Sequence, residues 1–208
     1  MRKAFIIPIV LLFSGSTFGQ SKDTINSRLA FDYWEKSLAL ERDNQIEKAI
    51  ATIDSAIFLD ASNHWMYSDK SEMLRSVGKY MPAAEALLKA VNISGTFDSN
   101  PKGALYGVYL HIGIQYEKGG DTLSAQRYYR KGKSMFEERR SLAGDEFFQM
   151  QNDLDYAMLL LLTGDQNGWN RAYKELKMKY GHASDVSSLQ KATHRDELRD
   201  LYFKRYGG

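Results

Sequence analysis

The sequence predicts an all-α protein built as an array of helical hairpins, and three observations support this class. The 208 residues include only 3 prolines, and strong helix formers run through them largely without interruption. The alternation of apolar and polar residues that is typical of strands is hard to find. A set of identical residues also recurs after 34 residues, a period typical of a helical hairpin. The hydrophobic content of 43% indicates a folded domain with a substantial core.

Residues 1–19 are expected to be a secretory signal peptide. Arg2 and Lys3 precede the apolar run 4–13, and small polar residues follow it. This run is shorter than the roughly 20 residues that span a membrane, and a retained N-terminal helix is the alternative reading. Cleavage would leave residues 20–29 as an N-terminal tail. Because the chain contains no cysteine, we expect a soluble exported protein, periplasmic or secreted, and not a lipoprotein.

The first two hairpins are predicted over residues 30–63 and 64–97. Six residues of the first recur in the second at a shift of 34: Tyr33, Lys36, Ser37, Leu40, Ala49 and Ala56 match Tyr67, Lys70, Ser71, Leu74, Ala83 and Ala90. The second helix of each unit carries one apolar stripe at helical spacing. Asn44 and Gly78 stand before these stripes and mark the turns. The recurring alanines are expected where paired helices approach most closely.

Two further hairpins are predicted over residues 106–139 and 150–183. In the third unit, Gly119 and Gly120 form the turn between two helical patterns. The polar stretch 98–103 precedes this unit and is expected to be a loop. In the fourth unit the turn falls at residues 163–165, and its register is open by one residue.

Five residues, together with the period of 34, resemble the tetratricopeptide repeat (TPR) family: Ile112, Gly113, Tyr116, Gly120 and Ala125. The resemblance covers about residues 30–180 and implies an α-α superhelix. It also implies binding of a protein or peptide, since this is the common role of the family, but it does not identify the partner. The first two repeats depart from the family at its usual Leu, Gly and Pro positions, which hold Lys36, Lys70, Ser37, Ser71 and Ala61.

The resemblance also implies a concave groove lined by the first helix of each hairpin. The family's lining positions correspond here to Phe31, Trp34, Leu38, Trp65, Ser68, Glu72, Leu110, Ile114, Leu154 and Met158. This lining is mainly apolar, so we expect an extended or helical segment with apolar anchors to bind there with modest salt dependence. The alternative is that Trp34, Leu110 and Leu154 are ordinary core residues.

Residues 184–208 lie outside the repeats and are expected to form a C-terminal capping helical segment. Thr193 and Asp196 resemble a helix start, and Leu198, Leu201 and Tyr202 form a narrow apolar edge. Repeat arrays need a polar outer end, which such helices commonly provide. Whether this segment caps the array or occupies the groove is left open by the sequence.

The charge balance argues against nucleic acid and membrane surfaces as partners. Removal of residues 1–19 takes away two basic residues and no acidic one, which leaves 26 of each. Nucleic-acid affinity depends on cations that neutralise phosphates, so a neutral chain is a poor candidate. A basic run from Arg127 to Lys133 could hold an acidic partner, but Glu137 and Glu138 follow it closely.

No catalytic, cofactor or metal site is predicted. Four scattered histidines lack the spacing of a metal site, and the chain has no cysteine nucleophile or phosphate-binding loop. Adjacent carboxylates on a helix point about 100° apart, so they cannot act together as acid and base. We therefore expect a protein- or peptide-binding scaffold of the bacterial periplasm or extracellular space, and not an enzyme. The alternatives are an inhibitor or immunity-type protein that blocks a secreted enzyme and, less favoured, an enzyme with unrecognised chemistry.

Overall fold

The computed structural model describes residues 18–94, 105–139, 146–182, 197 and 200. Between Phe18 and Tyr180 these form eight α-helices without any strand, so the predicted all-α class is confirmed. The helices are α1 (Phe18–Arg42), α2 (Ile46–Leu59), α3 (His64–Ser76), α4 (Tyr80–Ser94), α5 (Leu105–Lys118), α6 (Thr122–Arg139), α7 (Glu146–Leu162) and α8 (Gln166–Tyr180). None of them is both long and apolar enough to cross a membrane.

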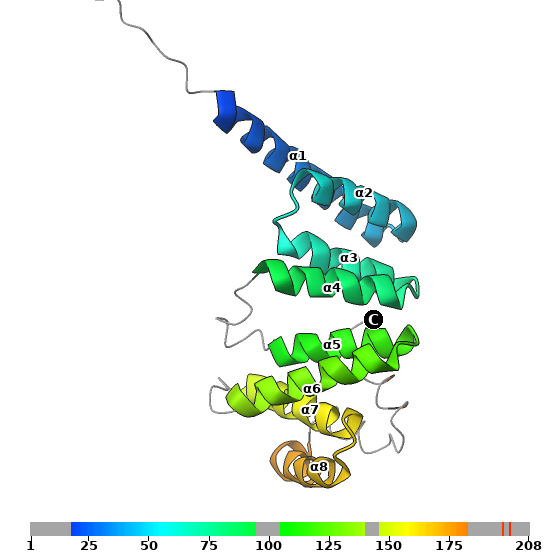
Figure 1. Cartoon of the computed structure of the whole chain (residues 1–208), viewed down its shortest axis with the longest axis vertical. Coiled ribbons are helices and arrows are strands. Elements are labelled where there is room, and N and C mark those ends of the chain that lie inside the picture. Colours follow the sequence, from blue (N-terminus) through cyan, green and yellow to red (C-terminus); the bar gives the residue numbers. More distant parts are fainter. Residues whose placement is uncertain (1–17, 95–104, 140–145, 183–196, 198–199, 201–208) are drawn as a thin grey trace, which may run out of the picture.

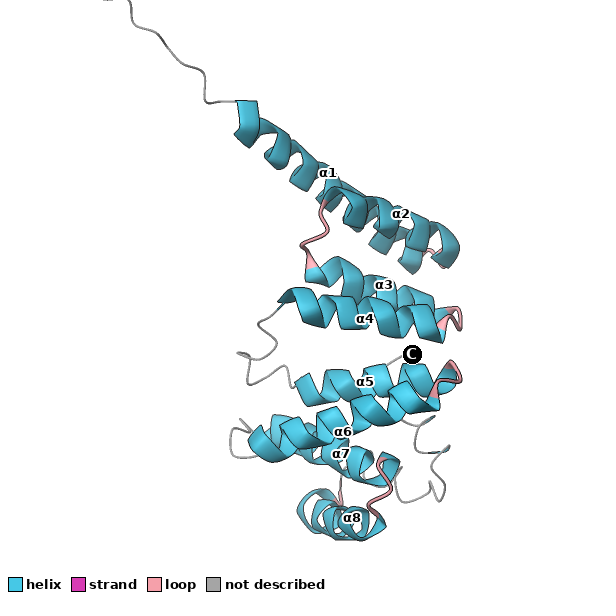
Figure 2. Cartoon of the chain, in the orientation of Figure 1, coloured by secondary structure: helices cyan, strands magenta, loops and turns pink. Residues whose placement is uncertain are grey.

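The helices pair in chain order and stack as four successive hairpins. Figure 1 shows the stack along the longest axis of the molecule, from α1 and α2 to α7 and α8. Short loops join the two helices within each pair (Figure 2). Each helix contacts its neighbours in the chain, and α5 also contacts α7, the first helix of the next hairpin. This is the predicted repeat array.

Each hairpin turn contains one residue in the left-handed backbone region. These residues are Asn44, Gly78, Gly120 and Gly164, with φ values of 58°, 74°, 90° and 83°. The residue after each one donates its backbone N–H to a carbonyl five residues earlier, as from Gln45 to Leu40 at 2.8 Å. This is the Schellman arrangement, which satisfies free carbonyls at a helix end. The turns predicted at these four places are confirmed.

α1 begins earlier than the sequence suggested. Residues 20–29, expected as a tail, belong to its first part, so α1 has 25 residues where α2 has 14. The reason is local, because residues 20–42 contain neither proline nor glycine. Figure 1 shows α1 projecting beyond its partner. Residues 1–17 lie outside the described part, and the signal peptide stays a prediction.

The core is divided into clusters of unequal size. The first hairpin and α3 share a small one, made of Ala30, Ala49, Ile53, Ala56, Met66 and Met73. A larger cluster runs from α4 to α8 and contains most of the buried aromatic side chains. Ala49, Ala83 and Ala90 are fully buried, as expected of residues at close helix contacts. The second hairpin therefore joins an N-terminal part with a small buried core to a C-terminal part with a large one.

Candidate partner-binding site

Trp34 of α1 joins the first hairpin to the second. Its indole Nε1 donates a hydrogen bond to Oδ2 of Asp69 on α3, at 2.6 Å. The ring of Phe31 meets Trp34 edge-on, with ring centroids 5.8 Å apart. The half-buried Trp34 also packs against the small N-terminal cluster. An indole held at both its apolar body and its polar end has a fixed orientation.

Phe31 and Trp65 are exposed aromatic residues at the same place in two successive repeats. Their side chains are 47% and 56% exposed. Asn63 fixes the position of Trp65, because its side chain accepts the Trp65 backbone N–H at 3.0 Å and starts α3. The ring of His64 lies against Trp65, with centroids 4.7 Å apart. Large aromatic surface is thus left open at the beginning of α3 and on α1.

Carboxylates gather on the same side of α1 and α3. Burial raises the pKa of Glu41, and the nearby charges of Asp69 and Glu72 raise it further. Burial also raises the pKa of Asp69, although its hydrogen bond from Trp34 works in the opposite direction. The Arg75 guanidinium pairs with Glu72. Crowded, partly desolvated carboxylates favour a cation, because it would offset their mutual repulsion.

These residues define one surface, which we name the aromatic–acidic face: Phe31, Trp34, Glu41, Trp65, Asp69 and Glu72. Phe31, Trp34, Trp65 and Glu72 were among the predicted groove residues. Leu38 packs half-buried against the N-terminal cluster, and Ser68 is also half-buried.

The other predicted groove residues lie inside the C-terminal core. Leu110, Ile114, Leu154 and Met158 are 0%, 1%, 4% and 2% exposed. All four belong to the large cluster of α4 to α8. Their placement on an open groove is therefore corrected, and the alternative that Leu110 and Leu154 are core residues holds in this structure. The physical reason is packing, because contacts between helices in this half of the array cover apolar side chains at these positions.

Sequence reasoning missed Glu41 and Asp69. Helical spacing could have found Glu41, because it stands seven residues, or about two turns, after the predicted groove residue Trp34. Asp69 comes directly after Ser68, which had been assigned to the groove. Its interaction with Trp34 depends on how neighbouring hairpins pack, and such packing leaves no local pattern in the sequence.

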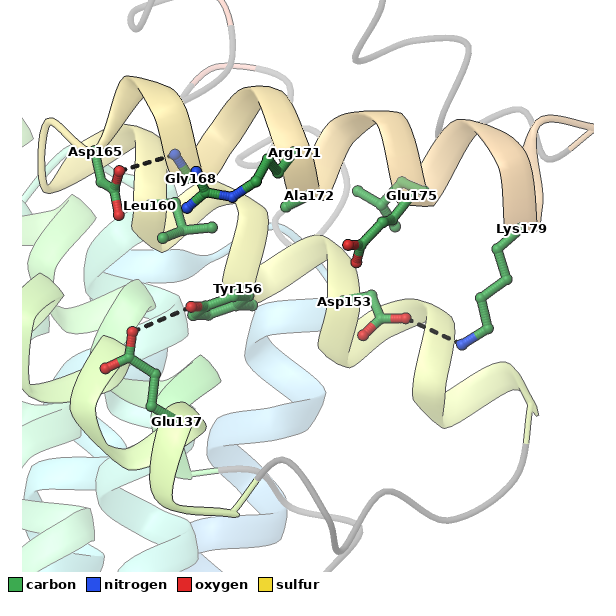
Figure 3. Close-up of a pocket in the computed structure, with 11 residues that line it drawn as sticks. Glu137, Asp153, Tyr156, Leu160, Asp165, Gly168, Arg171, Ala172, Glu175 and Lys179 are labelled. Carbon is green, nitrogen blue, oxygen red and sulfur yellow. Dashed lines mark hydrogen bonds and ion pairs between the residues drawn. The ribbon is translucent and has the colours of Figure 1, made fainter.

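A separate polar pocket lies between the end of α6 and the last hairpin (Figure 3). It has a volume of about 490 Å³ and is lined by Glu137, Asp153, Tyr156, Leu160, Asp165, Gly168, Arg171, Ala172, Glu175, Leu176 and Lys179. Several of its polar groups are engaged within the fold. Lys179 Nζ lies 3.3 Å from Asp153 Oδ2, and the Tyr156 hydroxyl donates to Glu137 Oε1 at 3.1 Å.

The carboxylate of Asp165 in this pocket caps a helix. It accepts the Gly168 backbone N–H at 2.8 Å, and this bond, together with Lys133, lowers the pKa of Asp165. A lowered pKa suits a structural cap and not a general acid. Within the described residues, no group of three or more His, Asp or Glu side chains is placed to hold a metal ion.

No protein-family model and no curated protein sequence matches the chain. Solved structures do match its fold. A Podosopora anserina protein with nearly identical TPR-like repeats of kinesin light chain type is 11% identical, with a TM-score of 0.56 over 79% of this chain and 77% of that one. A point variant of that protein gives a TM-score of 0.57 at 11% identity, over 74% and 75% of the two chains.

YrrB, described as a TPR protein with an unusual peptide-binding site, is 16% identical to this chain. The likeness has a TM-score of 0.53 and covers 88% of this chain and 91% of YrrB. Identities this low relate folds and do not relate binding sites. The chain thus has the fold of a TPR-like helical repeat array, as its period of 34 predicted.

Proposed function

We propose that the protein is a scaffold that binds a polypeptide segment carrying lysine or arginine beside an apolar side chain. The segment is held on the aromatic–acidic face. The observation that carries the proposal is the meeting of Glu41, Asp69 and Glu72, with Trp34 hydrogen-bonded to Asp69 and Phe31 packed against Trp34. Trp65 stands four residues, about one helical turn, before Asp69 on α3. A cation beside these carboxylates would be attracted by their charge and by the faces of the aromatic rings. The TPR-like fold supports this choice, since YrrB is described as having a peptide-binding site.

The charged part of this face changes the expected salt dependence. An apolar groove alone would bind with little dependence on ionic strength. Carboxylates at the surface attract a basic segment, and added salt screens this attraction. Binding should therefore weaken clearly as the ionic strength rises. Binding should also weaken as the pH falls through the raised pKa values of Glu41 and Asp69, because protonated carboxyls no longer attract a cation.

A peptide series of matched length can test the proposal. Labelled peptides that combine apolar residues with lysine, with glutamate or with serine are titrated with the protein, and fluorescence anisotropy gives their affinities. The lysine series should bind best. Glu41→Gln and Asp69→Asn should each weaken its binding by about three- to tenfold. Trp65→Ala should weaken it by a similar factor through loss of the aromatic surface.

Glu47→Gln is the matched control, because Glu47 is an exposed carboxylate on α2 of the same hairpin. It should leave the affinity unchanged. Equal binding of the lysine and glutamate series would contradict the proposal, as would full binding by the Glu41→Gln and Asp69→Asn variants.

We further propose that the scaffold works in the bacterial periplasm or outside the cell and has no catalytic activity. The support for export is the basic, apolar and small-residue order of residues 1–19. The mass of the protein recovered from the exported fraction tests this directly. A chain that begins near Gln20 is expected, and a chain that retains residues 1–13 would contradict it.

A further inference from the structure

The fourth hairpin lacks aromatic rings that fill the same place in the third hairpin. The two hairpins align on their left-handed turn residues, Gly120 and Gly164, which stand 44 residues apart. In the third hairpin the Tyr128 ring of α6 stacks with the rings of Tyr109 and Tyr116 on α5, with centroids 6.0 and 5.4 Å apart. All three tyrosines are buried. Their rings therefore fill the space between the two helices at this level.

Smaller side chains hold these places in the fourth hairpin. At the same offset of 44 residues, the places of the three tyrosines are taken by Ala172 of α8 and by Asp153 and Leu160 of α7. The first two hairpins also carry a tyrosine at the place of Asp153, namely Tyr33 and Tyr67. Ala172, Asp153 and Leu160 all line the polar pocket described above. That pocket therefore includes the space that the missing rings leave.

The pocket offers apolar surface to a bound ring. Its volume of about 490 Å³ is typical of small-molecule sites, which range from about 300 to 1,000 Å³. Leu160 and Leu176 are almost completely buried and form its apolar base. Tyr156 also lines it and is held by the ring of Phe136, which stacks on it with centroids 4.2 Å apart. A ring above Ala172 would bury its apolar surface against these side chains.

The polar part of the pocket has one negative charge in excess. Its charged side chains are four carboxylates and two cations: Glu137, Asp153, Asp165, Glu175, Arg171 and Lys179. Lys133 adds a third positive charge, because its Nζ lies 3.8 Å from Glu137 Oε1 and 3.3 Å from Asp165 Oδ2. A ligand with a single positive charge would neutralise this set.

Asp153 and Glu175 mark the place for that charge. Figure 3 shows their side chains facing one another across the pocket, from α7 and α8. In the third hairpin these two places are held by Tyr109 and Lys131, whose Nζ lies 4.3 Å from the centre of the Tyr109 ring. Two carboxylates thus replace a ring and a cation. Asp153 accepts two hydrogen bonds within the fold, at 3.3 Å each, and a carboxylate has about four acceptor sites.

We propose that this pocket binds a small aromatic amine. The ring of the ligand lies over Ala172, and its protonated amine lies between Asp153 and Glu175. The ligand supplies the ring and the positive charge that the third hairpin supplies from its own side chains. This site consists of described residues, whereas the predicted capping segment 184–208 lies outside them apart from residues 197 and 200. The site is separate from the aromatic–acidic face, so each proposal can fail without the other.

Tyramine is a suitable probe, because it joins a phenol ring to a primary amine. Nuclear magnetic resonance titration of the full chain gives its affinity and those of two matched compounds. In 3-(4-hydroxyphenyl)propionate a carboxylate replaces the amine, and propylamine has the amine without the ring. Tyramine should bind about tenfold or more tightly than either compound. Equal affinity for the two ring compounds, or for the two amines, would overturn the proposal.

Three variants locate the ligand. Ala172→Tyr restores the ring of the third hairpin and should weaken tyramine binding by about tenfold or more, because the new side chain takes the place of the ligand ring. Asp153→Asn keeps the size of the pocket and should weaken binding by about three- to tenfold. Glu138→Gln is the matched control, since Glu138 is an exposed carboxylate on α6 outside the described pocket lining. It should leave the affinity unchanged.

Thermal melting followed by circular dichroism establishes that each variant is folded. A folded Ala172→Tyr variant that binds tyramine as well as the native chain would overturn the proposal, because the ligand would then lie elsewhere. If Ala172→Tyr does not fold, Asp153→Asn decides, and its full binding would overturn the assigned place of the amine. An equal loss of binding in Glu138→Gln would mean that tyramine responds only to the overall charge, which would overturn the pocket as its site.

Discussion

Gly113 on α5 stands where the first two hairpins carry Ser37 and Ser71. Both serines are fully buried, and the Ser71 hydroxyl donates to the Ala83 carbonyl at 2.8 Å. A Cβ at Gly113 would overlap the ring of Tyr129 on α6. The difference comes from the facing helix, because the place of Tyr129 is held by smaller side chains in the earlier repeats. The size of the residue at this position therefore depends on the side chain that faces it from the second helix of the same hairpin.

Gly113→Ser should therefore destabilise the protein, although serine is the native residue at this place in two other hairpins. The expected cost is about 1 to 3 kcal/mol from overpacking. In a Tyr129→Leu background the same change should cost much less, because the two sites are in contact and their effects do not add. Urea unfolding of the four proteins in this cycle measures both values. Additive costs would show that Tyr129 does not set the size of the residue on α5.

Glu41→Gln should raise the melting temperature near neutral pH. The raised pKa of Glu41 means that the folded state keeps this proton to a higher pH than the unfolded chain does. The stability that comes from binding this proton is fully present below the pKa of Glu41 in the unfolded chain. It is lost as the pH rises through the pKa of Glu41 in the folded state. Glutamine avoids that loss, so the increase in melting temperature should be present at about pH 7 and absent at about pH 3.

Melting curves of Glu41→Gln and the control Glu47→Gln over this pH range test the prediction. A gain of the same size at both pH values would exclude ionisation of Glu41 as its cause. A gain in Glu47→Gln would mean that any lost charge on this hairpin has the same effect.

Some residues of the site could be read from the sequence, and others could not. The small residues and turn glycines were predictable, because close helix contact and left-handed backbone restrict the residue type at one position. The exposure of Phe31 and the burial of Leu110 were not, although both stand at groove positions of the repeat. Their difference depends on what packs over each helix, and a repeat register carries no information on that.

At the scale of the helices, the four hairpin turns have the same backbone arrangement, and the residue at its left-handed position is glycine in all but one of them. Gly78, Gly120 and Gly164 hold the left-handed position, and a Cβ at any of them would meet no atom within 4 Å. The need for glycine is therefore conformational and not steric. Asn44 fills the same position in the first hairpin, since asparagine tolerates this region better than most residues.

Substitutions at these turns should shift stability in opposite directions. Gly78→Ala should destabilise by about 1 kcal/mol, the cost of a left-handed alanine. Asn44→Gly should stabilise by up to about 1 kcal/mol, because it relieves the same strain in the first turn. Urea unfolding gives both values. Destabilisation by Asn44→Gly would show that the asparagine side chain makes a contribution that outweighs its backbone strain.

The helices themselves were largely predictable, because turn residues and apolar stripes bound each one. The beginning of α1 was not, since residues 20–29 lack any apolar stripe that would distinguish a helix from a tail. These residues continue a helix that the first hairpin has already nucleated, and elongation of an existing helix needs no tertiary contact. The ion pair between Asp200 and Lys118 at the end of α5 was equally hidden, because it joins distant parts of the chain.

For the whole molecule, the unequal core clusters predict unfolding in more than one step. Repeat arrays are held together mainly by contacts between neighbours, so weak repeats can open before strong ones. The small cluster of α1 to α3 should open at a lower urea concentration than the large cluster of α4 to α8. Trp34 and Trp65 report on the first part and Trp169 on the second.

Two variants can resolve these steps. One carries phenylalanine at Trp169, and the other carries phenylalanine at both Trp34 and Trp65. The fluorescence transition of the first variant should come at lower urea than that of the second. Coincident transitions, matching the loss of helix by circular dichroism, would mean that the array unfolds as one cooperative unit.

If the chain is exported, as proposed above, the same imbalance bears on the order in which it acquires its structure. Ribosomes release the N-terminal hairpins first, and secretion channels also take that end first. Folding of a repeat array can nucleate in any repeat and spread to its neighbours, so we expect the most stable repeats to be favoured as the starting point. Here those repeats come last along the chain, in α5 to α8. The N-terminal hairpins would therefore remain unfolded, and able to pass through a channel, until synthesis is nearly complete. They would fold against the C-terminal hairpins only after these had also crossed the membrane.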